Sequence, residues 1–124
     1  MATVKSTLKL TSTDLTTDSL DVTVLNTLTS IVTGGLHRRK LWGTATGSQE
    51  ELAEETHYAG SAYVYVKNCQ SGTTDNVYLE IGGADNMVLA PGEWAWFPWS
   101  AAGDDINAYA TTQGSIIEYG IFGA

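Results

Sequence analysis

Hydrophobic and polar residues alternate in short stretches along most of the chain, which is the pattern of half-buried β-strands. The alternation is plainest in four segments, residues 63–66, 77–81, 106–110 and 115–122. Gly, Asn and Asp residues separate the strand-like segments at near-regular spacing, as in sandwiches and small barrels. The pattern therefore predicts an all-β fold, an antiparallel β-sandwich of jelly-roll type with at most one short helix.

The opening of the chain is rich in Thr and only weakly hydrophobic. Hydrophobic and polar residues alternate there only over short, separate stretches. A further short strand is predicted within residues 36–46. We expect residues 1–45 to form an extended N-terminal arm with the first strands, and residues 46–124 to form the compact β-sandwich of a single domain. The arm has few apolar residues to bury by itself, so we expect it to gain order against a neighbour.

One segment departs from the β pattern. Ser48-Gln49-Glu50-Glu51 fits a helical capping box, with Ser48 as N-cap and Glu51 reaching back to its N–H. This predicts one short helical turn. The four carboxylates here are interpreted as the solvated face of a short helix, with a general acid and base pair as the alternative: Glu50, Glu51, Glu54 and Glu55.

A heavily aromatic strand is predicted after a tight turn. Pro91-Gly92 is typical of the centre of such a turn, because Pro presets φ and Gly takes the permissive position. Beyond it, Trp94 and Trp96 are expected on one face of the strand and Phe97 on the other. Pro98 has no N–H to donate, so we expect ladder pairing to stop there.

Two interpretations of these aromatic residues stay open. They supply the large buried area that a small core needs, or they form a binding surface, where Trp and Tyr dominate the energetics. Exposed, coplanar rings would also suit a carbohydrate. One face of the strand could serve the core while the other serves an interface.

Charge narrows the range of partners. The formal net charge is −8, with only 6 Lys and Arg residues. This argues against binding to nucleic acid, which needs many cations, and against an anionic membrane surface. His37-Arg38-Arg39-Lys40 holds half of the cations, and is either a strand protected from edge pairing or a docking patch for an acidic neighbour.

Residues that carry chemistry are sparse. Cys69 is the single cysteine, so no intrachain disulfide can form. We expect a buried or half-buried free thiol, with a disulfide between subunits as the alternative. His37 and His57 lack the paired spacing of zinc ligands. A nucleophilic pair of Cys69 with a histidine is kept as a remote alternative. We predict no catalytic residues, no cofactor and no metal site, and no secretory signal is recognised in the sequence.

Four segments within residues 63–122 resemble small virion structural proteins of tailed bacteriophages. They are Tyr63-Val-Tyr-Val-Lys-Asn68, Val77-Tyr-Leu-Glu-Ile-Gly82, Leu89-Ala-Pro-Gly-Glu-Trp94 with Phe97-Pro98, and Ile117-Glu-Tyr-Gly-Ile-Phe122. The resemblance implies a non-enzymatic virion component made in the host cytoplasm. The expected function is that of a capsid decoration (cement) protein on the head exterior, and the alternative is a tail or fibre accessory protein that binds a receptor or glycan.

The resemblance also implies partners, namely the major capsid protein and further copies of this chain, with a trimer expected from the class. We expect the arm and the basic strand to clasp capsid protein, and residues 93–99 to divide between core and subunit interface. The predicted partner-binding residues are Arg38, Arg39, Lys40, Trp42, Trp94, Trp96 and Trp99.

Overall fold

The structure, a computed structural model, describes residues 2–14, 20–31, 34–58, 60–100 and 104–123. Contacts within the chain separate it into two units, Met1–Val32 and Thr33–Ala124. Each unit is described by itself.

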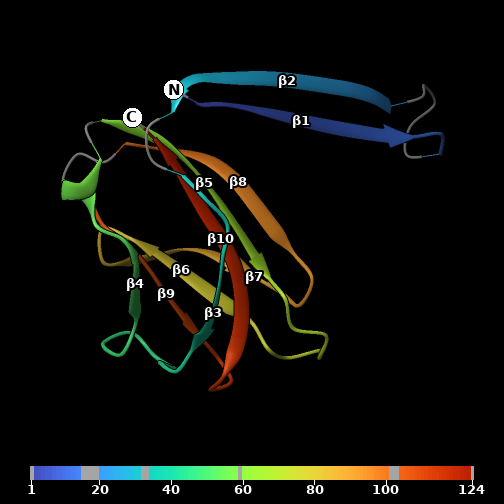
Figure 1. Cartoon of the computed structure of the whole chain (residues 1–124). Coiled ribbons are helices and arrows are strands. Elements are labelled where there is room, and N and C mark those ends of the chain that lie inside the picture. The colour runs from blue at the N-terminus through green and yellow to red at the C-terminus, as the bar shows by residue number, and fades with distance from the viewer. Residues whose placement is uncertain (1, 15–19, 32–33, 59, 101–103, 124) are drawn as a thin grey trace. The chain divides into compact units, whose positions relative to one another are not determined.

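The second unit is a β-sandwich. Two four-stranded antiparallel sheets, with strand orders β3-β10-β5-β8 and β4-β9-β6-β7, form its layers (Figure 1). The strands are β3 (His37–Leu41), β4 (Glu50–Ala53), β5 (Ser61–Asn68), β6 (Val77–Ile81), β7 (Ala84–Leu89), β8 (Trp94–Ser100), β9 (Ile106–Ala110) and β10 (Ser115–Gly123).

Strand pairing in the sandwich is nested along the sequence. The outermost pair is β3 with β10, followed by β4 with β9, β5 with β8 and β6 with β7. Such nested pairing across two sheets is the arrangement of a jelly roll. The all-β antiparallel sandwich predicted from the alternation is confirmed, and β3, predicted as a short strand, is an edge strand of it.

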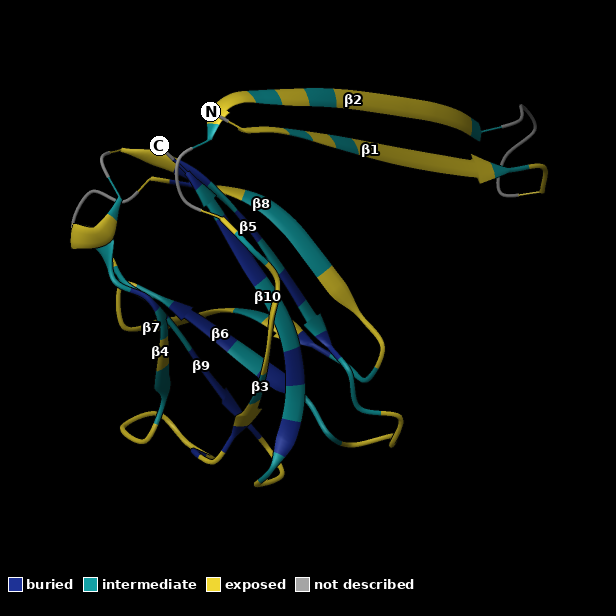
Figure 2. Ribbon diagram, in the orientation of Figure 1, coloured by how far each residue is buried: buried dark blue, intermediate teal, exposed yellow. Residues whose placement is uncertain are grey.

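The hydrophobic core lies between the two sheets and follows the two-residue period of the strands. In β5, Ala62, Val64 and Val66 are buried while the residues between them are half-buried (Figure 2). Ile117 and Ile121 of β10 and Leu79 of β6 are buried in the same core cluster. Burying each such aliphatic side chain contributes about 1.5–3 kcal/mol, so this core accounts for the order of the sandwich.

The first unit is a two-stranded antiparallel hairpin of β1 (Ala2–Ser12) and β2 (Leu20–Ile31). Its register places Leu8 opposite Val24 and Leu10 opposite Val22. None of its described residues is buried, in contrast with the sandwich strands (Figure 2). Residues 2–12 and 20–31 of the predicted arm thus form regular β-structure in which no described residue is buried, whereas β3, also within the predicted arm, belongs to the sandwich.

The helical turn predicted at Ser48–Glu51 is wrong, because Glu50–Ala53 forms strand β4. Ser48 does not cap a following helix. Its Oγ accepts hydrogen bonds from the N–H groups of Thr44 and Ala45, which precede it, and so closes a loop. The glutamates therefore do not form the solvated face of a helix.

Among the described residues, the only helical segment is the 3-10 turn η1 (Glu55–His57). No helix within those residues has the length and apolar character needed to cross a membrane.

The Pro91-Gly92 turn is confirmed. The Glu93 N–H donates to the Ala90 carbonyl over 2.9 Å, and Gly92 has a φ of 83°, which favours glycine. The expectation that Pro98 ends ladder pairing is wrong, since β8 continues to Ser100 and Pro98 lies opposite Tyr63. β8 is an edge strand, where a residue without an N–H is tolerated.

The fully buried side chain of Asn68 ties this turn to the sheet. Its Nδ2 donates to the carbonyls of Asp75, at 2.7 Å, and Leu89, at 3.0 Å. Its backbone N–H donates to the Glu93 carbonyl, and its carbonyl accepts from the Gly92 N–H. Two of the segments that carry the resemblance are therefore in direct contact, and Asn68 fixes the start of β8.

Candidate binding surface

The outer side of the β3-β10-β5-β8 sheet carries most of the exposed aromatic and cationic side chains of the sandwich. We call this side the aromatic face. Alternation and register assign to it Arg38 and Lys40 of β3, Ile116, Glu118 and Phe122 of β10, Tyr63, Tyr65 and Lys67 of β5, and Trp94 and Trp96 of β8.

The aromatic rings on this face are packed against one another. Tyr63 and Trp96 stack, with ring centroids 5.4 Å apart and planes inclined by 25°. Phe122 lies beside Trp96, with centroids 6.0 Å apart. Contacts of this kind hold the rings in place, so a partner would meet a preformed apolar surface.

Trp94 stands at the exposed end of the same face. Its side chain is 55% exposed, whereas Trp96 is half-buried among its neighbours. Across the sheet, Trp94 lies opposite Lys67. An exposed indole beside a cation is the kind of feature that dominates binding interfaces.

A row of charged residues crosses the sheet and ends at Trp94. Arg38 pairs with Glu118, which pairs with Lys67 on the next strand. Glu118 accepts a hydrogen bond from the Tyr65 hydroxyl at 3.0 Å and lies 3.6 Å from the Arg38 Nε. Burial and then this hydrogen bond raise the pKa of Tyr65 above its ordinary value. The single carboxylate of the face is thus engaged.

The two lysines of the face differ from its arginine. Within the part of the chain that the structure describes, neither Lys40 nor Lys67 has an ion pair. Their ammonium groups are available to a partner, so the aromatic face has a net positive charge within a chain of net charge −8.

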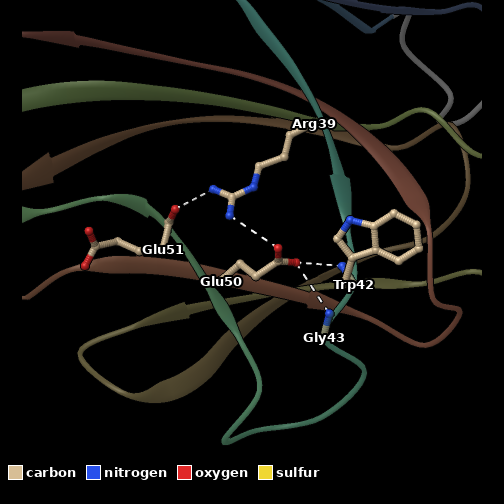
Figure 3. Close-up of polar contacts among 5 residues, drawn as sticks. All are labelled: Arg39, Trp42, Gly43, Glu50 and Glu51. Atoms are coloured by element: carbon tan, nitrogen blue, oxygen red, sulfur yellow. Dashed lines mark hydrogen bonds and ion pairs between the residues drawn. The ribbon is translucent and has the colours of Figure 1, made fainter.

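Arg39, by contrast, forms its contacts within the sandwich. Its guanidinium donates to the Glu51 carbonyl at 2.7 Å and to the Glu50 carboxylate at 3.3 Å (Figure 3). The other oxygen of Glu50 accepts the N–H groups of Trp42 and Gly43, at 2.7 and 3.4 Å. Because β3 and β4 belong to different sheets, this cluster joins the two layers along one open side.

Two of the predicted partner-binding tryptophans lie away from the aromatic face. Trp42 follows β3 and is 56% exposed beside the Glu50 cluster (Figure 3). Trp99 is buried in the core, where its Nε1 donates to the Asp104 carbonyl at 3.0 Å. The structure therefore brings together only Arg38, Lys40, Trp94 and Trp96 from the predicted set.

Six further residues of the face were not predicted as site residues: Tyr63, Tyr65, Lys67, Ile116, Glu118 and Phe122. The sequence did contain a signal for those on β5. The β5 residues of the face alternate with Val64 and Val66, which belong to the core. Their side chains must therefore point to the outer side of the sheet. Their position beside Trp96 depends on a strand pairing that alternation does not determine.

The outer side of the other sheet has a different character. Tyr78 and Tyr109 stack with nearly parallel planes, and the Tyr109 hydroxyl donates to Asp85 at 2.8 Å. Glu80 is fully buried and accepts a hydrogen bond from Thr46. The second carboxylate oxygen of Glu80, Oε2, is buried and has no hydrogen-bond partner among the described residues. No cation lies on the strands of this sheet.

The candidate catalytic groups lie apart from one another. Cys69 is a half-buried free thiol, as expected, and its Sγ contacts Arg38 and the Lys67 carbonyl. The His37 ring lies tilted against that of Tyr119, with centroids 5.4 Å apart, while His57 lies 3.4 Å from Glu54. Within the described residues, no three His, Cys, Asp or Glu side chains form a cluster that could hold a metal ion.

One cavity opens between the two sheets beside His37. Its volume is about 120 Å³, and it is lined by Gly34, His37, Leu52, Tyr58, Tyr119 and Ile121. Burial raises the pKa of Tyr58 above its ordinary value, so this phenol is neutral near pH 7. The lining offers an imidazole and two phenols but no carboxylate.

No family model matches the chain, and no curated protein matches it.

Proposed function

We propose that this chain is a non-enzymatic virion structural protein, a capsid decoration protein that binds the outer surface of a phage head. The observation that carries the proposal is the aromatic face. On one sheet it combines an exposed indole, packed rings and two lysines that form no ion pair with any described residue.

The composition of the aromatic face favours a protein partner with an acidic surface. Trp94 and Trp96 provide apolar contact area, which supplies most of the affinity in protein interfaces. Lys40 and Lys67 with Arg38 add attraction and orientation toward carboxylates. A lattice of identical shell subunits presents the same site many times, so modest affinity per copy suffices.

The fold is compatible with this proposal by analogy. Jelly rolls occur in viral capsid proteins and in lectins, although a fold alone does not specify a function. The resemblance of residues 63–122 to virion proteins points in the same direction.

The direct test is to count copies of the protein in purified virus particles by quantitative mass spectrometry. A decoration protein is expected at about one copy per shell subunit, or per three, because it follows the symmetry of the lattice. Absence from the particles would contradict the proposal. A few copies per particle would place the protein on the tail or its fibres.

A matched pair of variants tests whether the aromatic face is the docking surface. Trp94 and Val88 are both exposed, at 55% and 48%, but lie on opposite sides of the sandwich. In co-sedimentation with particles that lack the protein, Trp94→Ser is expected to weaken binding at least tenfold, because an interface anchor is lost. Val88→Ser is the control and is expected to bind like wild type. Equal binding by both variants would exclude this face.

A second function, glycan binding as a tail or fibre accessory, is favoured by one observation. The stacked Tyr63 and Trp96 rings next to the exposed Trp94 resemble a platform on which sugar rings could lie. Host surface polysaccharide should then quench tryptophan fluorescence, and Trp94→Ser should abolish the change. Trp42→Ser is the control, since Trp42 is equally exposed but off the face.

A further inference from the structure

The N-terminal hairpin is amphipathic. The register places Val4, Leu8, Leu10, Leu20, Val22, Val24 and Leu28 on one side, which we call the hairpin apolar face, together with the uncharged polar residues Ser6, Ser12 and Asn26. The opposite side carries Lys5, Thr7, Lys9, Asp21, Thr23, Leu25 and Thr27. The hairpin apolar face contains no charged residue.

Within the hairpin itself, no described residue covers this face. Leu8, Leu10, Val22 and Val24 are each more than a third exposed, and Val24 reaches 52%. A two-stranded hairpin is marginal at best in water unless a further layer covers its apolar side. The regular pairing of β1 with β2 therefore requires a partner that covers this side.

The sandwich offers no matching surface of its own. Its exposed large hydrophobic residues are Leu36, Trp42, Val88 and Trp94, which lie on separate elements. The aromatic face is interrupted by the charged row of Arg38, Glu118 and Lys67. Among the residues that the structure describes, an uncharged and mainly aliphatic surface of equal length exists only as the hairpin apolar face itself.

We propose that the hairpin apolar face is covered by the same face of a second copy of this chain. Two hairpins stacked face to face form a small sandwich whose interior is mainly aliphatic, with the opposed Ser6 and Asn26 as its uncharged polar part. Lys5, Lys9 and Asp21 then remain on the solvent side, so no charge is buried. The contact is isologous, because each copy uses the same residues.

The size of the face predicts how strong this contact is. From residue 4 to residue 12 the strand spans about 27 Å, at about 3.4 Å per residue, and the face is two strands wide. This is smaller than the roughly 800 Å² per partner of a standard stable interface. The pair is therefore expected to dissociate on dilution.

Sedimentation velocity of the full chain over a range of concentrations tests the proposal. Wild type is expected to shift from monomer to dimer as concentration rises. Leu8→Thr is expected to weaken the association at least tenfold, because it places a hydroxyl in an aliphatic interface. Leu25→Thr makes the same chemical change on the opposite side of the hairpin and is expected to have no effect. A monomer at every concentration, or equal effects of both variants, would overturn the proposal.

Crosslinking keeps the test decisive if Leu8→Thr disorders the hairpin. Leu8 lies at the middle of the face, near the twofold axis in either orientation of the two hairpins. In a Cys69→Ser background, Leu8→Cys is expected to form dimers with a short bismaleimide, and Leu25→Cys is not. Crosslinking of both, or of neither, contradicts the proposal. All tryptophans lie beyond residue 41, so their fluorescence verifies independently that the sandwich is folded.

Discussion

The hairpin and the sandwich use the same strand pattern but differ in what happens to their apolar residues. In the sandwich, inward residues such as Val64 and Leu79 are fully buried between two sheets. In the hairpin, Leu8 and Val24 occupy equivalent alternating positions but stay exposed. Alternation specifies a face, and only a second layer turns that face into a core. The sandwich contains its second layer, and we infer that the hairpin obtains one from another copy.

Asn68→Ala is expected to have the largest effect, because it should destabilise the sandwich and leave the hairpin unchanged. The substitution removes the side-chain donor to the half-buried Asp75 carbonyl and the buried Leu89 carbonyl, and should lower the free energy of unfolding of the sandwich by about 3 kcal/mol. Urea unfolding followed by tryptophan fluorescence measures it. Asn26→Ala in β2 is the control and should not change that transition. A similar loss from Asn26→Ala would mean that the units unfold together.

A smaller loss is expected from Glu50→Ala. The change removes the acceptor for Arg39 and for the N–H groups of Trp42 and Gly43, and should cost about 2 kcal/mol. Glu51→Ala is the matched control, since Arg39 contacts only its backbone carbonyl, which the substitution retains. Thermal melts of both variants provide the comparison. Equal melting temperatures would show that the Glu50 cluster does not stabilise the sandwich.

Alkaline pH should weaken the sandwich, because all tyrosines belong to it and none to the hairpin. Burial, followed by the bond to Asp85, raises the pKa of Tyr109, and burial and then Glu118 raise that of Tyr65. The folded state thus holds these protons more tightly than the unfolded state. The resulting stability is fully present below pH 10 and is lost as pH rises through the folded-state pKa values.

Urea unfolding between pH 8 and pH 11 measures this loss. Tyr109→Phe removes one of the raised groups, so its stability should fall less steeply than that of wild type above pH 10. An identical pH profile for the two proteins would contradict the assignment.

The smallest effect is expected from removing residues 1–32. Each unit is compact by its own internal contacts. The unfolding free energy of the sandwich should therefore change by less than about 0.5 kcal/mol. Self-association should disappear in the same truncated protein. A truncated protein that fails to fold would show that the sandwich depends on the hairpin.

Local patterns predicted most of the fold. Alternation located β5, β6, β9 and β10, and the Pro91-Gly92 dipeptide located the turn before β8. The errors arose where a distant partner decides the outcome. The capping box at Ser48 is a local signal, and pairing of β4 with β9 overrides it. Pro98 is tolerated because β8 is an edge strand, which the sequence does not reveal.

The candidate site was predicted only in part, for the same reason. Arg38, Arg39 and Lys40 are adjacent in sequence, but successive side chains of a strand point to opposite sides of the sheet. Arg39 therefore points away from the aromatic face and contacts Glu50 between the sheets. Trp99 likewise has the inward parity of β8 and belongs to the core. Strand parity separates these residues, whereas the neighbours of Trp96 from β5 and β10 follow only from the topology.

Hydrogen exchange at low and high protein concentration tests the central claim most directly. The account predicts that amides of β1 and β2 become more protected as concentration rises, because a second copy covers the hairpin. Amides of β5 and β10 in the sandwich should be equally protected at both concentrations. Hairpin protection that does not depend on concentration would contradict the account.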